Sequence, residues 1–285
     1  MRIVVATSLL VGLIARVGVA GVATYGVQHT STSQRPLWRG DRFVALTLDT
    51  STIPDADVPV LTAGFEAWSS ATASCGGVTF GLTRDDVPGT VFEGETVHIR
   101  TDRWCSPDSS ECYDPASASV THLTFVDNPD DPDDGEVVGA DVELNAVDFE
   151  LVLPGQAATT TKPALDLQSV MTHEAGHVIG LAHDCATGDE PWPVDDRGNA
   201  VPSCDAEPLP ADVLPATMYY EIAPGDLSAR TPKANDIAGA CALLLLTPEP
   251  EVDGVGGCSA TQPGGLAPLA CVLLFVARRR RCASC

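Results

Sequence analysis

The chain has 285 residues, 39 acidic side chains against 16 basic ones, and a formal net charge of -23 at pH 7. Such an acidic surface repels phosphate backbones, which excludes nucleic acid as a partner, and it attracts divalent cations. A solvated acidic shell without a specific partner is the alternative. Once both ends are set aside, roughly 200 residues remain, the size of one well-cored domain, and we expect a monomer.

The amino end has the layout of a secretory signal peptide. A basic residue precedes the apolar run 3–14, and small residues follow through Ala20 and Ala23. We therefore expect residues 1–23 to direct export, with cleavage after Ala20 or Ala23. An uncleaved anchor is the alternative, because Arg16 lies close behind the apolar run.

Export bears on the ten cysteines, because disulfides form in oxidising compartments. Six cysteines lie between the two ends of the chain and allow many different pairings. Pairing across the shortest loops joins Cys105 to Cys112, Cys185 to Cys204 and, by remainder, Cys75 to Cys241. The last bridge would join the first helix to the final one. None of the six forms the CxxC pairs of a structural zinc site, so a metal needs other ligands.

The domain opens with a predicted strand and helix. Residues 43–48 suit a strand with both faces apolar enough for burial. A helix is predicted to open at Asp55, because Leu61, Phe65 and Trp68 then recur at helical spacing. We expect these three side chains to face the core.

Further strands are predicted at residues 78–82 and 96–101, separated by sequence rich in Asp, Pro, Gly and Ser. Residues 139–147 alternate strictly between apolar and polar side chains, which predicts a half-exposed strand. The acidic run 127–136 offers many hard oxygen ligands, as a Ca²⁺ site requires, but without the spacing of an EF-hand. A calcium loop and a solvated loop both stay open.

Two helices are predicted in the second half of the chain. Asp166 has the chemistry of an N-cap for a helix that runs to about Gly180. Thr231 and Pro232 have the N-cap and first-turn chemistry of a last helix that runs to about Leu246. Strands and helices together predict the α+β class.

Residues 247–257 are a linker rich in Pro, Glu and Gly that cannot bury a core. The tail, residues 258–285, continues with a Gly/Cys motif at Cys258, an apolar segment at 266–277 and an arginine run at 278–281. It resembles the MYXO-CTERM sorting tail, which implies retention at the cell surface through the membrane. An ordinary stop-transfer anchor is the alternative. We expect an exported protein, extracellular or anchored at the surface.

Residues 172–184, Thr-His-Glu-Ala-Gly-His-Val-Ile-Gly-Leu-Ala-His-Asp, carry the strongest functional signal. On a helix, His173 and His177 project from one face a single turn apart, so both imidazoles can reach one ion. Gly180 can take the left-handed conformation that ends a helix and reverses the chain. The reversal would bring His183 to the same ion as a third ligand.

Three neutral imidazoles leave the positive charge of Zn²⁺ largely undiminished, so a bound water becomes acidic enough to act as a nucleophile. Glu174 lies beside it and can take the proton of that water and deliver it to the leaving amine of a peptide bond. The spacing would arise by chance on the order of once in 10⁵ such sequences. We therefore predict zinc-dependent hydrolysis with Glu174 as the catalytic base.

These residues match HExxHxxGxxH, the metzincin zinc-binding motif, and residues 24–246 resemble a metzincin catalytic domain. The resemblance implies a twisted, mainly parallel five-stranded sheet with three helices. It also implies a Met-turn at Met218, which would lie as an apolar floor beneath the histidines. In the matrixin branch, an Asp at the position of Asp236 bonds back to the Met-turn. In this family an edge strand, here residues 139–147, pairs with the extended substrate.

Other features differ from the matrixin pattern. No Pro-Arg-Cys-Gly segment precedes the domain, so latency of that type is not expected. Only His98 and His122 are available for a second, structural zinc, so one catalytic ion is predicted. An Asp directly after the third histidine, here Asp184, resembles the adamalysin branch. A Tyr two residues after the methionine, here Tyr220, resembles the astacin branch. Tyr220 is either an outer ligand or oxyanion donor, or a packed aromatic with a backbone partner, which we favour.

The sequence thus predicts a secreted or surface-anchored zinc metalloendopeptidase that cuts internal bonds of extracellular polypeptides. The alternative from another class is a surface adhesion or binding module that retains zinc without turnover. Glu174 separates the two, because an inactive site has no use for it. A non-peptidase hydrolase is a third candidate, and the extension through Gly180 and His183 argues against it.

Overall fold

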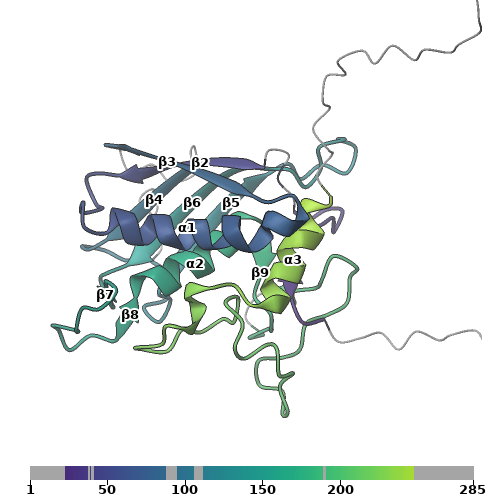
Figure 1. The fold of residues 1–285 in the computed structure, drawn as a ribbon. Coiled ribbons are helices and arrows are strands. Elements are labelled where there is room, and N and C mark those ends of the chain that lie inside the picture. Colours follow the sequence, from purple (N-terminus) through teal and green to yellow (C-terminus); the bar gives the residue numbers. More distant parts are fainter. Residues whose placement is uncertain are drawn as a thin grey trace, which may run out of the picture. The chain divides into compact units, whose positions relative to one another are not determined.

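The computed structural model describes residues 23–37, 39, 42–87, 95–105, 112–188 and 191–246, whose fold is drawn in Figure 1. The predicted signal peptide, apart from Ala23, lies outside the described residues, as do the predicted linker and the tail. Within the described ranges, no helix has both the length and the apolar character needed to cross a membrane.

A five-stranded sheet with the strand order β3-β2-β4-β6-β5 forms the frame of the domain. Its strands are β2 (Phe43–Asp49), β3 (Thr79–Asp85), β4 (Glu95–Arg100), β5 (Ser119–Phe125) and β6 (Val137–Asn145). All neighbouring pairs are parallel except β5 with β6, which is antiparallel. With three α-helices, this mixed sheet confirms the predicted α+β class.

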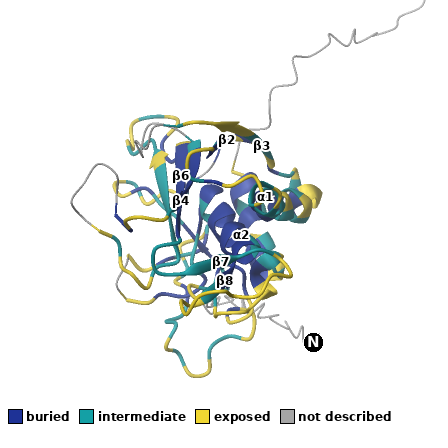
Figure 2. Cartoon of the chain, turned by 90° about the vertical axis from the view of Figure 1, so that its left-hand side faces the viewer, coloured by how far each residue is buried: buried dark blue, intermediate teal, exposed yellow. Residues whose placement is uncertain are grey.

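Two helices, α1 (Val58–Thr72) and α2 (Leu167–Val178), cover one face of the sheet, as the two views in Figures 1 and 2 show. Leu61, Phe65 and Trp68 of α1 are fully buried, as their helical spacing predicts. Asp166 caps α2 by accepting a hydrogen bond from the Ser169 backbone N–H at 2.8 Å. The apolar core lies between these helices and the sheet.

The third helix, α3 (Ala234–Leu244), lies near the end of the described chain. Two small sheets complete the domain: β1 (Gly26–Val27) pairs antiparallel with β9 (Leu181–Ala182), and β7 (Glu150–Val152) pairs parallel with β8 (Ala164–Asp166). Single 3-10 turns are formed by η1 (Ala73–Cys75) and η2 (Ser228–Arg230). The β1–β9 pair joins the amino-terminal part of the domain to the segment that follows α2.

Two helices begin later than the sequence predicts. Helix α1 has Asp57 at its N-cap instead of Asp55, because a turn from Pro54 to Asp57 precedes it. Helix α3 has Lys233 at its N-cap instead of Thr231. The Asp236 carboxylate accepts a hydrogen bond from the Lys233 backbone N–H at 2.6 Å, and this bond sets the first turn.

The prediction for β6 is wrong in two respects. The strand is not half-exposed, because Asp141, Glu143 and Asn145 are buried on the sheet face opposite the helices. Arg100, for example, donates a hydrogen bond to the Glu143 carboxylate. Nor is β6 an edge strand, because β5, which the sequence analysis did not predict, lies outside it. An alternating pattern of apolar and polar residues shows that the two faces of a strand differ. It does not show whether other residues cover the polar face.

The outer face of β2 also differs from its prediction. Phe43 is 52% exposed and Ala45 is exposed, whereas Val44, Leu46 and Leu48 on the opposite face are buried. Phe43 lies over Gly81 of β3, where any Cβ would come within 2.3 Å of the Phe43 ring. The aromatic ring therefore covers a neighbouring glycine at the surface instead of entering a second core.

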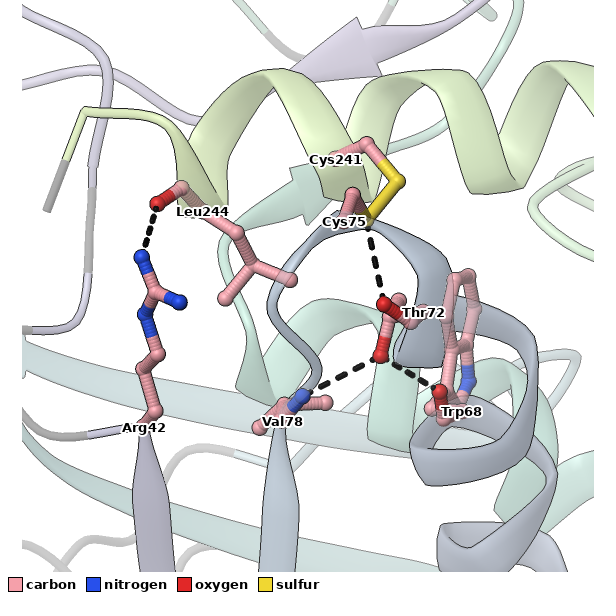
Figure 3. The surroundings of a disulfide bond; sticks show 7 residues. All are labelled: Arg42, Trp68, Thr72, Cys75, Val78, Cys241 and Leu244. Atoms are coloured by element: carbon pink, nitrogen blue, oxygen red, sulfur yellow. Dashed lines mark hydrogen bonds between the residues drawn. A yellow bond between two sulfur atoms is a disulfide. The ribbon is translucent and has the colours of Figure 1, made fainter.

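All three predicted disulfides are present: the two short-loop pairs, Cys105–Cys112 and Cys185–Cys204, and the remaining pair, Cys75–Cys241. The Cys75–Cys241 bridge joins the turn after α1 to α3 (Figure 3). Beside it, the Thr72 hydroxyl donates to the Trp68 carbonyl at 2.8 Å and accepts from the Val78 backbone N–H at 3.1 Å. The bridge therefore links two helices at a point where the local backbone is already hydrogen-bonded.

Replacing Cys75 and Cys241 with alanine should lower the free energy of unfolding by about 2–5 kcal/mol, because the bridge closes a long loop of the unfolded chain. The two cysteines are 166 positions apart in sequence. The control removes Cys105–Cys112, which spans only 7 positions and should cost less. Urea unfolding of both variants measures the difference, and an equal loss from the two bridges would contradict the prediction.

Candidate metal centre

The metal-site segment is a helix followed by an abrupt reversal. His173 and His177 belong to α2, which ends at Val178. Gly180 follows with φ +100, a left-handed conformation, and a Cβ there would lie 3.0 Å from the Leu37 carbonyl oxygen. Both the backbone angle and the close approach require glycine. The chain then enters β9 and reaches His183.

The three histidines that the sequence singles out come together. Their ligand atoms lie within 4.8 Å of one another, and this is the one group of potential metal ligands found in the described part of the chain. The Nε2 atoms of His173 and His177 are 3.1 Å apart. A tetrahedral zinc with Zn–N bonds near 2.0–2.1 Å would separate two ligand nitrogens by about 3.3 Å. The spacing therefore fits a shared metal ion.

Backbone carbonyls orient two of the rings. Nδ1 of His173 lies 2.7 Å from the Thr217 carbonyl, and Nδ1 of His177 lies 2.8 Å from the Leu181 carbonyl. Since a carbonyl only accepts, each Nδ1 must carry the proton, so Nε2 is the nitrogen of each neutral ring that can bind a metal. These partners are backbone atoms, so no sequence pattern could have identified them.

The lowered pKa of His173 agrees with a neutral ring. Burial lowers this pKa well below its usual range, and the neighbouring His177 and His183 rings lower it further. Two protonated imidazoles cannot face each other at this distance without strong repulsion. At neutral pH His173 is therefore a neutral ligand, the form that a metal ion requires.

Glu174 is 3% exposed, and both of its carboxylate oxygens accept hydrogen bonds from β5. The Ser119 hydroxyl donates to Oε1 at 2.6 Å, and the Thr121 hydroxyl donates to Oε2 at 2.6 Å. Sequence reasoning missed both residues, because no strand was predicted at β5. The available signal was the presence of two hydroxyl side chains two positions apart. This signal is weak when the strand itself is not predicted.

Met218 is fully buried against α2. A Cβ on Gly176 would lie 2.3 Å from the Met218 sulfur, so the absence of a side chain on the helix makes room for it. The Asp236 carboxylate accepts from the backbone N–H groups of Thr217 at 2.9 Å and Met218 at 3.0 Å. Helix α3 thereby holds the methionine segment in place beside the histidines.

Asp184, directly after the third histidine, is also buried. Its carboxylate accepts from Asn235 Nδ2 at 2.6 Å and from the Gly26 backbone N–H at 3.4 Å. Asn235 also donates to the Thr24 carbonyl at 2.9 Å. Burial, with the Asp236 carboxylate close by, raises the pKa of Asp184 well above its usual range. This network ties the amino-terminal segment to α3 and to the metal-site segment.

Other predicted residues lie elsewhere or differ in environment. Tyr220 is 40% exposed, and its ring lies edge-on to that of Tyr219, with the two ring centroids 4.8 Å apart. This exposure does not fit the prediction of a packed aromatic side chain. Its role as an outer ligand or oxyanion donor stays a prediction. His98 contacts Asp49 and His122 contacts Tyr113. Neither belongs to the group of three histidines.

The acidic loop 127–136 is hydrogen-bonded to residues 31–33. The Asp127 carboxylate accepts from the Ser31 and Thr32 hydroxyls, and buried Asp134 accepts from the Ser33 hydroxyl. Asp134 also accepts from the Asn128 backbone N–H at 2.9 Å. These contacts give the loop a structural role, and calcium binding stays a prediction.

Comparisons with known proteins do not assign this chain to a family. No protein-family model matches it, and no curated protein matches it either. Its function is therefore inferred from its own residues: the histidine group, the buried glutamate and the segments that position them.

Gly180→Ala should destabilise the protein by more than about 1 kcal/mol and weaken metal binding, because alanine strains the left-handed backbone and displaces His183. Gly188→Ala is the matched control, since Gly188 has a similar φ of +96 but nothing within 4 Å of its Cβ position. The Gly188→Ala variant should be destabilised by its strained backbone but should bind zinc with wild-type affinity. Calorimetric unfolding and zinc titration of both variants distinguish the two effects, and equal zinc affinity would contradict the prediction.

The protein should bind one zinc ion per chain, and His183→Ala should lose at least about tenfold in zinc affinity through removal of one of three ligands. His122→Ala should retain the wild-type stoichiometry, because His122 lies outside the group of three histidines. Equilibrium dialysis with elemental analysis gives both numbers. A second tightly bound ion that disappears in His122→Ala would show that the single-ion prediction is wrong.

Proposed function

We propose that this protein is a zinc metalloendopeptidase of the metzincin kind. The observation that carries the proposal is the convergence of three imidazoles, two of them with their Nδ1 atoms on backbone carbonyls, next to a buried carboxylate at Glu174. Each part has a separate use in peptide hydrolysis: ligands for the ion, and a base for water.

Zinc is the metal that best suits this donor set. Three neutral nitrogen ligands and a remaining open position are typical of catalytic zinc, whereas calcium and magnesium prefer oxygen ligands. When bound, zinc would supply Lewis acidity that activates water and polarises the peptide carbonyl. His173, His177 and His183 would hold it.

The proton transfers fall to Glu174. Its carboxylate takes the proton of the attacking water and passes it to the nitrogen of the leaving amine, so the net reaction consumes one water and releases two peptides. Burial of this carboxylate limits its exchange of protons with bulk solvent. The substrate would lie along β5, the antiparallel edge strand, through backbone hydrogen bonds.

The metzincin assignment has further support in the surroundings of the histidines. A buried methionine, Met218, packs on the helix that carries the first two ligands, and Asp236 of α3 binds the backbone of the methionine segment. Met218 would serve as the apolar floor of the site, and Gly180 as the hinge that brings His183 into position. The five-stranded mixed sheet with three helices is compatible with that fold.

The proposed setting is outside the cell. Three disulfides are stable in an oxidising compartment, which agrees with the predicted export signal. We propose polypeptide substrates, a monomeric enzyme, and attachment to the cell surface through the tail at residues 258–285. The acidic composition argues against a nucleic-acid partner.

The wild-type protein should cut a quenched fluorescent peptide library, and a zinc chelator should abolish the cutting. Glu174→Gln keeps the size of the side chain but cannot take a proton, so kcat should fall by about 10²–10⁴-fold while zinc stays bound. Zinc content measured on the same samples is the control. If zinc binds and nothing is cut by the wild type, a zinc-retaining adhesion or binding module replaces the peptidase.

A further inference from the structure

We propose that Ser119 and Thr121 are positioning residues, whose hydroxyls hold the Glu174 carboxylate in the orientation from which it accepts the proton of water. This inference rests on the proposed function for its catalytic consequence. Its structural content, a specific bond between each hydroxyl and Glu174, stands on the geometry of the site.

Each oxygen of the Glu174 carboxylate accepts one of the two hydrogen bonds. Ser119 donates to Oε1 and Thr121 donates to Oε2, each at 2.6 Å. A single bond would let the carboxylate turn about its terminal torsion, whereas one bond to each oxygen fixes its plane. Each oxygen keeps a second lone pair, which is free for water.

The strand explains why both hydroxyls reach the same side chain. Ser119 and Thr121 are two positions apart on β5, so their side chains point to the same face of the sheet. In the register of the pair they lie opposite Leu144 and Val142, whose side chains belong to the apolar core beneath the helices. The two hydroxyls therefore face α2 and Glu174.

The chemical nature of the partners also matters. Over the residues that the structure describes, these two hydroxyls are the side chains that hydrogen-bond to Glu174, and no lysine or arginine forms an ion pair with it. A buried carboxylate without any donor would be strongly destabilising. The two neutral hydroxyls satisfy the carboxylate without a charged side-chain partner, so its position depends on these two hydrogen bonds.

Strand β5 is also the edge strand on which we propose that the substrate binds. The same strand would then position the base and the peptide relative to each other. Loss of the hydroxyls should misplace Glu174 without removing any backbone group that pairs with the peptide. The expected kinetic signature is a fall in kcat with an unchanged KM.

The test uses the full chain with Thr121→Val, which keeps the shape of threonine, and Ser119→Ala. Each should lower kcat by about tenfold, change KM by less than about twofold and leave zinc content unchanged. The exchange Thr121→Ser should restore most of the activity, because it retains the hydroxyl. Thr83→Val is the matched control, since Thr83 is an exposed residue of β3, the opposite edge strand of the sheet. Unchanged kcat, or a loss confined to KM, would overturn the proposal.

A second measurement needs neither zinc nor turnover. In the zinc-free protein, Thr121→Val should lower the folding equilibrium constant by about tenfold, but by much less when Glu174 is already alanine, because the bonded partner is then missing. Equal effects in the two backgrounds would overturn the bond itself. If the wild type cuts no peptide, the proposed function fails, whereas this cycle still decides whether the hydroxyls hold Glu174.

Discussion

The arrangement of the site depends on the reversal of the chain at Gly180. The first two imidazoles are placed by one turn of α2, but the third ligand comes from a segment that must run back toward the helix. A left-handed residue in close contact with the Leu37 carbonyl makes that reversal, and only glycine fits both conditions. The Gly180 carbonyl then accepts from the Gln28 backbone N–H at 2.8 Å, which joins the reversal to the amino-terminal segment.

Around this reversal, the rest of the domain acts as a support for α2. One side of the helix packs on α1, where Trp68 donates from its indole to the Thr172 carbonyl at 2.6 Å. Its amino end is capped by Asp166, which also accepts from Arg230 at 2.9 Å. Met218 packs against α2 at Gly176. Helix α3 joins these supports through Asp236 and through its disulfide to Cys75.

The polar groups of the site divide into two kinds. Backbone carbonyls hold two of the three imidazole rings, so the orientation of these two depends on the path of the chain. Side-chain hydroxyls from β5 hold Glu174, so its orientation can change with a single substitution. This division allows metal binding and base placement to be altered separately, which is the physical basis for distinguishing a ligand defect from a positioning defect.

The sequence by itself determined the local features: the helix with two histidines a turn apart, the glycine stop, the cap at Asp166 and the α+β class. All of these depend on spacings of a few residues. Two disulfide pairs followed from short loops, and the third was the pair that remained. Tertiary structure alone decided that β5 is the edge, that the polar face of β6 is buried, and that Ser119 and Thr121 reach Glu174. The physical reason is that strand order and the cover of a sheet face depend on contacts between distant segments, which a local pattern does not encode.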